Sequence, residues 1–207
     1  TRDNNVRADS TAEKLAKLRP VFDTSAAGTL TAGNSTPLTD GAAAVLLASE
    51  AWAAERNLPV LALLTYGKAW AVDFASGKEG LLMAPAHAVS EMLKDAGLGL
   101  QDFDFYEIHE AFAAQVLSTL AAWESADYCR DRLGRDRPLG AIDRTKLNLK
   151  GSSIAYGHPF AATGARILAV AAKLFSELPN ARRGLISVCT AGGMGVTAIV
   201  ERPDVAR

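Results

Sequence analysis

Residues 184–201 read GLISVCTAGGMGVTAIVE, and this stretch holds two apolar runs separated by a turn rich in glycine. The runs 184–189 and 196–201 have the length and the content of branched residues that are typical of buried strands. Residues 190–195 favour a tight turn, because glycine adopts backbone conformations that are closed to other residues. The end of the chain therefore predicts a pair of adjacent strands.

Toward the N-terminus, helix-like and strand-like segments alternate. The expected elements are a loop at 148–162 leading into a helix at 163–177, a helix at 111–123, a strand at 103–108, a helix at 86–96 that ends at Gly97, and a strand within 60–72. Less regular segments are a short helix at 11–19, a run at 41–49 whose end suits a buried strand, a short helix at 51–57, and a charged surface excursion at 124–144. The alternation predicts an α/β fold: a mixed, mostly buried β-sheet with helices on both faces.

Composition excludes several classes of function. The chain has 207 residues, 49% of them hydrophobic, which is enough for a sizeable core, but no apolar run approaches the roughly 18–20 residues that span a bilayer. Its 22 basic and 23 acidic residues nearly cancel, so neither nucleic acid nor an anionic membrane surface is an expected partner. Cys129 and Cys189 are expected to be reduced thiols of a cytoplasmic protein. The chain begins at Thr1 rather than Met and shows no secretory signal, so we expect a trimmed or partial polypeptide.

Three places combine a reactive side chain with an unusual backbone pattern, and the first is His109. It follows the expected strand 103–108 and precedes the expected helix 111–123. Proteins of the α/β class build sites at such carboxyl ends of strands. The alternative is that His109 and Glu110 simply begin the helix.

The second place is His158, between Gly157 and Pro159 in a loop of small residues. Pro159 favours an extended backbone at His158, and the amides of the following helix favour negative charge nearby. A histidine in this position can titrate near neutral pH and act as a general base. The alternative is a structural histidine in a turn.

The third place is Cys189, which is followed by Gly192, Gly193 and Gly195. A ligand could meet backbone amides there, although a lone cysteine is more commonly a small buried hydrophobic residue. The three histidines and two cysteines show no metal-binding spacing, so no metal is expected. The sequence also lacks a GxSxG elbow, a P-loop and a GxGxxG fingerprint.

Taken together, these segments resemble the C-terminal half of the thiolase family. The motifs are His-Glu-Ala-Phe at 109–112, Gly-His-Pro at 157–159 with Thr-Gly-Ala-Arg at 163–166, and Cys-x-x-Gly-Gly-x-Gly at 189–195. Residues 29–47 (TLTAGNSTPLTDGAAAVLL) extend the resemblance to the front of the chain. The His-Glu-Ala-Phe form resembles 3-ketoacyl-CoA thiolases of the trifunctional-enzyme β-subunit type, which cleave 3-ketoacyl-CoA with CoA in fatty acid β-oxidation.

The resemblance implies a role for each candidate residue. His158 would activate a nucleophilic cysteine that carries the acyl group as a thioester. Cys189 would move the proton at the α-carbon or on the CoA sulfur, and His109 would stabilise the oxyanion. Backbone support would come from Gly192, Gly193 and Gly195, and substrate contacts from Ser35, Thr36, Phe112 and Phe160.

The resemblance also implies what the chain lacks. Neither Cys129 nor Cys189 occupies a nucleophile position, so the nucleophile is expected in an N-terminal half that is absent here. The expected division is the end of a loop domain or linker at 1–27 and the thiolase C-terminal domain at 28–207. Ala161 stands where the family usually has glycine, a change that could tighten the pocket.

The expected partners are acyl-CoA and CoA as substrates without a further cofactor, the N-terminal thiolase half, further copies in a homo-oligomer, and a hydratase/dehydrogenase subunit. Two alternatives stay open: a module that binds acyl-CoA or lipid without catalysis, and an aldolase-like or decarboxylative condensing relative. His158 and Cys189 together argue against the first, and Cys189 argues against the second, where histidine or tyrosine usually stands. Acyl-chain length, the direction of reaction and the oligomeric state do not follow from the sequence.

Overall fold

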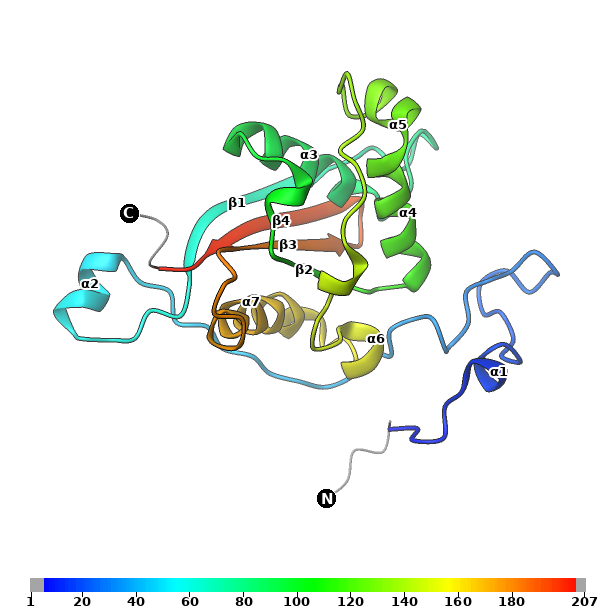
Figure 1. The fold of residues 1–207 in the computed structure, drawn as a ribbon. Coiled ribbons are helices and arrows are strands. Elements are labelled where there is room, and N and C mark those ends of the chain that lie inside the picture. The colour runs from blue at the N-terminus through cyan, green and yellow to red at the C-terminus, as the bar shows by residue number, and fades with distance from the viewer. Residues whose placement is uncertain (1–5, 204–207) are drawn as a thin grey trace.

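The computed structural model describes residues 6–203, and within them four strands form one mixed sheet (Figure 1). The strands are β1 (Leu63–Ala71), β2 (Phe105–Ile108), β3 (Arg183–Thr190) and β4 (Met194–Glu201), in the order β1-β4-β3-β2. β2 runs parallel to β3, whereas β4 is antiparallel to both of its neighbours, β1 and β3. The mixed sheet expected from the sequence is confirmed.

The terminal hairpin forms as its sequence predicts. Residues 191–193 join β3 to β4, and Cys189 is paired with Gly195 across the hairpin. Gly192 and Gly193 have φ values of 85° and 76°, which residues with a Cβ rarely adopt. The glycines therefore reverse the chain within a few residues of Cys189.

Helices cover both faces of the sheet, as expected (Figure 1). One face carries α3 (Ala84–Ala96) and α4 (Ala113–Glu124), and α5 (Ala126–Asp131) follows α4 directly. The other face carries α7 (Phe160–Glu177), preceded by the single turn α6 (Ser153–Tyr156). This layering leaves the C-terminal end of β2 between the start of α4 and the start of α7.

Local sequence signals set the ends of α3. Pro85 stands in its first turn, where the missing N–H costs no helical hydrogen bond, and Gly97 ends it with φ of 65°. Two 3-10 turns, η1 (Leu100–Asp102) and η2 (Arg144–Lys146), lie in the connections that follow. The helix end predicted at Gly97 is confirmed.

Alternation along β2 supplies two separate cores. Tyr106 packs on the side of α3 and α4 in a cluster with Trp123, and neither is more than 1% exposed. Phe105 points to the opposite face and meets the ring of Phe175 of α7 at a centroid distance of 5.2 Å. Because neighbours along a strand alternate between faces, Glu107 points to the same side as Phe105.

The first part of the chain lies outside the sheet. α1 (Ala12–Leu15) and α2 (Glu50–Glu55) are short and lie on opposite sides of the molecule (Figure 1). Residues 41–49 form no strand, so the buried strand expected there is wrong. A strand needs a neighbour to satisfy its backbone groups, and no strand within residues 6–203 runs beside this stretch. Leu46 and Leu47 are consequently 75% and 65% exposed.

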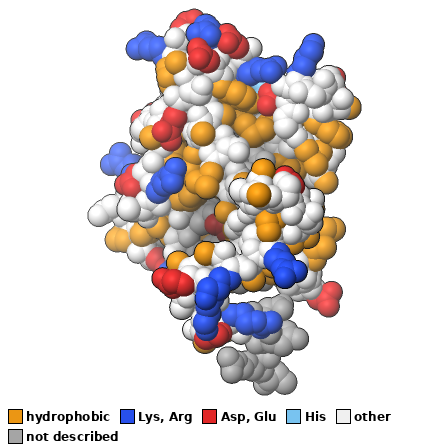
Figure 2. All heavy atoms as spheres, turned by 90° about the vertical axis from the view of Figure 1, so that its right-hand side faces the viewer, with side chains coloured by type: hydrophobic (Ala, Val, Ile, Leu, Met, Phe, Trp, Pro, Cys, Tyr) orange, Lys and Arg blue, Asp and Glu red, His pale blue; other side chains and the backbone are white. Residues whose placement is uncertain are grey.

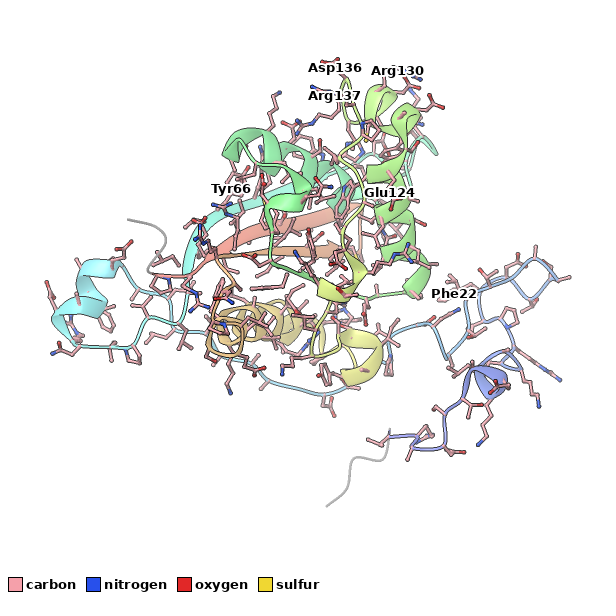
Figure 3. The ribbon with its side chains drawn as sticks, in the orientation of Figure 1. Phe22, Tyr66, Glu124, Arg130, Asp136 and Arg137 are labelled. Carbon is pink, nitrogen blue, oxygen red and sulfur yellow. The ribbon has the colours of Figure 1, made fainter. Side chains whose placement is uncertain are left out.

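The segment 124–144 is less of a surface excursion than its charge predicts. It contains α5, whose Cys129 is fully buried and donates its S–H toward backbone carbonyls of α4. The charges stay outside: Arg130 pairs with Asp127 at 2.9 Å and projects at the tip of α5 (Figure 3). Cys129 and Cys189 are both free and buried.

The surface of the chain is uneven in its chemistry. Figure 2 shows hydrophobic side chains across the middle of one face, with charged side chains at its top and bottom and along its left-hand edge. Among large hydrophobic residues, Phe22 is 68% exposed and Leu117 is 49% exposed. None of the helices within residues 6–203 has the length and hydropathy to cross a membrane.

Candidate active site

His109 lies directly after β2, at one end of the sheet. Its N–H donates to the carbonyl of Ser187 at 2.9 Å, which extends the pairing of β2 with β3 by one residue. α4 begins only at Ala113, so the alternative that His109 and Glu110 begin the helix is wrong. Glu110 instead accepts from Asn148 Nδ2 at 2.7 Å and fastens the loop beyond the strand. His109 itself is 2% exposed.

His158 reaches the same end of the sheet from the loop before α7. Its N–H donates to the carbonyl of Pro37 at 2.8 Å, and it forms a short extended bridge with Leu38. Gly157 precedes it with φ of 89°, and a Cβ there would lie 2.4 Å from Thr39 Cγ2. The extended backbone expected at His158 is therefore present and is fixed by residues 37–39.

The two histidine rings touch each other. Their centroids are 4.4 Å apart with 43° between the ring planes, and Phe160 packs edge-on against His158 at 4.8 Å. His109 also lines a small cleft with Cys189 and Gln115. The structure thus brings His109, His158 and Cys189 together from three segments, with His109 as the shared neighbour.

Cys189 is a buried thiol at the edge of this cleft. It is 7% exposed, and burial raises the pKa of its thiol to about 11, which backbone N–H groups of Cys189 and Ala111 offset only in part. The group therefore carries its proton at neutral pH. A thiol in this state can give a proton but is not a nucleophile.

Both site histidines are neutral near pH 7. Burial lowers the pKa of His109 from 6.5 to about 4, helped by the charge that His158 carries once it is protonated and by the charge of Arg166. Burial, followed by Arg166, also lowers the pKa of His158 from its usual value. A neutral imidazole has one N–H donor and one acceptor nitrogen, so each ring can either give or accept a hydrogen bond at Nε2.

A hydroxyl group holds each ring through Nδ1. Ser153 Oγ lies 2.9 Å from Nδ1 of His109, and Thr163 Oγ1 lies 2.6 Å from Nδ1 of His158. Behind the first hydroxyl, Arg166 donates from Nη2 to Ser153 Oγ at 2.8 Å. Sequence reasoning named no role for Ser153, Thr163 or Arg166. The order of the 163–166 motif pointed to the neighbourhood but not to these contacts.

Glu107 is a further residue that sequence reasoning missed. It is fully buried, and neither carboxylate oxygen has a hydrogen-bond partner among the described residues. Burial raises the pKa of this carboxyl from 4.5 to about 7, against the attraction of Arg166. A charged residue inside the buried run at 103–110 (FDFYEIHE) is the signal that could have revealed it.

The glycines after Cys189 allow close approach of neighbouring segments. A Cβ on Gly193 would lie 2.6 Å from the carbonyl oxygen of Val72, and one on Gly195 would lie 2.9 Å from Pro85 Cδ. A Cβ on Gly192 would meet open space. Gly193 and Gly195 thus have a packing role, and support of a substrate by the three glycines stays a prediction.

Ser35 and Thr36 cross between the two histidine loops. The Thr36 N–H donates to the carbonyl of Ala111 at 3.0 Å, and its hydroxyl donates to the carbonyl of Ser153 at 2.7 Å. Ser35 pairs with Phe112 and has a buried hydroxyl without a partner in residues 6–203. Ser35 and Thr36 therefore join the loops of the site, and their contact with a substrate stays a prediction.

The two aromatic candidates differ in exposure. Phe112 caps the start of α4 and meets Phe22 edge-on at 5.7 Å, where Phe22 lies to the side of α4 (Figure 3). Phe160 is 69% exposed beside His158, whereas Phe112 is only partly exposed. An exposed ring next to a site histidine suits contact with a ligand, and this role stays a prediction for both residues.

A wider groove lies away from the histidines. It has a volume of about 610 Å³ and runs between the end of α3 and residues 133–139, where Asp136 and Arg137 project (Figure 3). None of the candidate residues lines it. Within the described part of the chain, no group of three or more His, Cys, Asp or Glu side chains could hold a metal ion.

Comparison with known proteins decides the family. The family described as "Thiolase, C-terminal domain" matches residues 62–202, which include His109, His158 and Cys189. The chain belongs to the thiolase family. The thiolase N-terminal domain matches residues 1–51. The exposed stretch 41–49 falls within that second match.

Thiolases of known name and structure are similar over nearly the whole chain. A 3-ketoacyl-CoA thiolase of Alteromonas mediterranea is 47% identical over 203 residues, covering 97% of this chain and 45% of that protein. The acetyl-CoA acetyltransferase of Bacillus anthracis is 36% identical with a TM-score of 0.77, over 97% of this chain and 45% of that one. Human mitochondrial 3-ketoacyl-CoA thiolase is 32% identical with a TM-score of 0.75, again over 97% and 45%. The α/β thiolase fold is confirmed.

The chain spans about 45% of the length of the curated relatives it matches. The N-terminal domain match ends at residue 51 and the C-terminal domain match begins at residue 62, so both limits lie later in the chain than the boundary at 27/28 expected from the sequence. The boundary at 27/28 stays a prediction. The outermost residues of the two predicted domains, 1–5 and 204–207, lie outside the described part of the chain.

Proposed function

We propose that this chain is the proton-transfer half of an acyl-CoA acyltransferase, a 3-ketoacyl-CoA thiolase. The observation that carries the proposal is the meeting of His109 and His158, with Cys189 in the cleft that His109 lines. The thiolase names of the relatives support it. The whole protein would cleave 3-ketoacyl-CoA with CoA, or condense two acyl-CoAs in the reverse direction.

His158 is the general base of this proposal, and Thr163 supports the assignment. The Thr163 hydroxyl donates to the carbonyl of Pro159, so its oxygen can accept from Nδ1–H of His158 at 2.6 Å. That arrangement leaves Nε2 as the acceptor nitrogen. His158 would take the proton of the nucleophilic cysteine, which then attacks the keto carbon and holds the acyl group as a thioester.

Cys189 serves as the acid in the same reaction. Its buried S–H would protonate the α-carbon of the departing acetyl-CoA. The resulting thiolate would take a proton from the incoming CoA thiol, which attacks the acyl-cysteine. The nucleophilic cysteine then leaves as a thiolate and regains its proton from His158, which restores the starting state. His109 would donate a hydrogen bond to the thioester oxygen as that oxygen gains negative charge.

The partners follow from the same proposal. The nucleophile belongs to an N-terminal thiolase half, and acyl-CoA and CoA are substrates, with no separate cofactor. A homo-oligomer is supported by the similarity to the dimeric peroxisomal thiolase of Saccharomyces cerevisiae, which is 38% identical with a TM-score of 0.74 and is covered over 44% of its chain. A role in fatty acid β-oxidation, a hydratase/dehydrogenase partner and a cytoplasmic location extend the proposal.

Turnover of acetoacetyl-CoA with CoA tests the proposal. The 207-residue chain alone should give none, and the chain joined to an N-terminal thiolase half should give turnover. In the joined protein, Cys189→Ala should abolish turnover, while Cys129→Ala, a buried cysteine outside the cleft, should retain it. Turnover by the chain alone, or a fully active Cys189→Ala protein, would contradict the assignment; unchanged acyl-CoA binding without turnover would favour a binding module.

A further inference from the structure

A line of buried polar groups leads away from His109. Its Nδ1 lies 2.9 Å from Ser153 Oγ, and Arg166 Nη2 lies 2.8 Å from the same oxygen. Ser153 has no exposed surface and His109 is 2% exposed, so water has little access to either contact. The partners of this single hydroxyl therefore decide where its hydrogen points.

The hydrogens of this contact can be assigned by elimination. A guanidinium group only donates, so Arg166 occupies one lone pair of Ser153 Oγ. The hydroxyl hydrogen is then free for an acceptor, and Nδ1 of His109 is the acceptor in reach. If Nδ1 carried a proton and donated instead, the buried hydroxyl hydrogen would have no acceptor among residues 6–203. Buried polar groups are rarely left in that state.

We propose that Ser153 and Arg166 are positioning residues that hold His109 as a neutral ring with its proton on Nε2, so that the ring nitrogen that Ser153 does not contact is a fixed hydrogen-bond donor. The assignment of the proton follows from geometry alone. Its catalytic meaning, a donor ready for the developing oxyanion, rests on the proposed function. A neutral imidazole kept in one tautomer needs no rearrangement when the charge develops.

The neighbouring ring has the opposite arrangement. Thr163 Oγ1 lies 3.4 Å from the carbonyl oxygen of Pro159 and 2.6 Å from Nδ1 of His158. A hydroxyl that donates to this carbonyl accepts from Nδ1–H of His158, which leaves Nε2 of His158 as the acceptor nitrogen. Two histidines whose centroids are 4.4 Å apart thus present one donor and one acceptor at Nε2. The difference comes from the second partner of each hydroxyl: a guanidinium behind Ser153 and a carbonyl behind Thr163.

Glu107 is a third group that acts on Arg166, in addition to Ser153 and the ring of Tyr156. It lies two residues before His109 on the same strand face, and attraction between its carboxyl and Arg166 acts on the pKa of both groups. Arg166 also lies over the ring of Tyr156, at 5.6 Å from its centroid. These contacts orient a half-buried cation whose buried Nε and Nη1 have no hydrogen-bond partner in the described residues. The pKa of about 4 for His109 agrees with a ring that stays neutral.

The tautomers can be observed directly in the 207-residue chain. The sequence has three histidines, so a long-range nitrogen–proton correlation spectrum can resolve each ring. We expect His109 protonated on Nε2, and Ser153→Ala should give His109 a mixture of tautomers or the Nδ1–H form. Ser152→Ala, which removes an adjacent buried hydroxyl without contact to either ring, should leave the spectrum unchanged. His109 protonated on Nδ1 in the parent, or unaltered in Ser153→Ala, would overturn the inference.

Kinetics of the protein joined to an N-terminal thiolase half separate this inference from the proposed function. By analogy with residues that orient metal ligands, Ser153→Ala should lower kcat by about 10–100-fold with little change in KM. A tautomer change without any loss of kcat would refute the positioning role. Correct tautomers in a joined protein that never turns over would instead refute the proposed function and leave the proton assignment intact.

Discussion

His109→Asn offers a quantitative test of the buried neutral histidine, because asparagine keeps a polar group there but cannot titrate. The folded chain holds the pKa of His109 at about 4, against 6.5 in the unfolded chain, a difference of about 2.5 pH units. Each unit corresponds to 1.36 kcal/mol, so the ring contributes about 3 kcal/mol of pH-dependent stability. Because the folded pKa is lowered, this stability is present above pH 6.5 and is lost as the pH falls through about 4.

Urea unfolding of both chains across that range measures the effect. The parent should lose about 3 kcal/mol relative to His109→Asn between neutral pH and about pH 4, whatever the fixed cost of the substitution. Other titrating groups are common to both chains and cancel in the difference. Two stability curves that run parallel over the whole range would show that His109 titrates alike in folded and unfolded chains, and the reasoning would be wrong.

Three further predictions concern Glu107, Cys189 and the glycines of the hairpin turn. Glu107→Gln should act in the opposite direction. The pKa of the Glu107 carboxyl is about 7 in the folded chain against 4.5 in the unfolded chain, so the parent is stabilised below pH 4.5 and this stabilisation is lost as the pH rises through 7. In the same urea titration, the stability of the parent should therefore fall relative to that of the variant over this pH range. The Cys189 thiol, buried and with a pKa of about 11, should resist iodoacetamide at pH 7 until the chain is unfolded; rapid native alkylation there, seen by mass spectrometry, would argue for an open thiolate. Gly192→Ala should lower the free energy of unfolding by about 1–2 kcal/mol, because the residue has a left-handed backbone. Gly193→Ala should lower it by about 1–3 kcal/mol more, because its Cβ would also meet the Val72 carbonyl at 2.6 Å. Equal melting temperatures of the two variants would count against the close approach.

Local chemistry made much of the fold predictable. The helix end at Gly97 and the hairpin turn at 191–193 depend on glycine conformations that the sequence displays directly. The expected strand at 41–49 failed for the opposite reason. Strand formation requires a partner, and nothing in the composition of that stretch shows whether a neighbouring strand is present.

The same distinction holds for the site. His109, His158 and Cys189 stood out because each sits in a motif with unusual neighbours. Ser153 did not, because its importance lies in a contact with a residue 44 positions away. Glu107 could have been noticed as a charge in a buried run, but only the folded chain brings it near Arg166.

The solvent-exposed leucines of residues 41–49 have a practical consequence for preparation of this chain. Leu46 and Leu47 present most of their surface to water, and each square ångström of apolar area that a second molecule covers favours contact by about 25 cal/mol. Such attraction weakens on cooling and strengthens in sulfate or phosphate buffers. Self-association of the chain should therefore increase with concentration, warmth and those salts, and cold, dilute handling without them keeps the molecules apart.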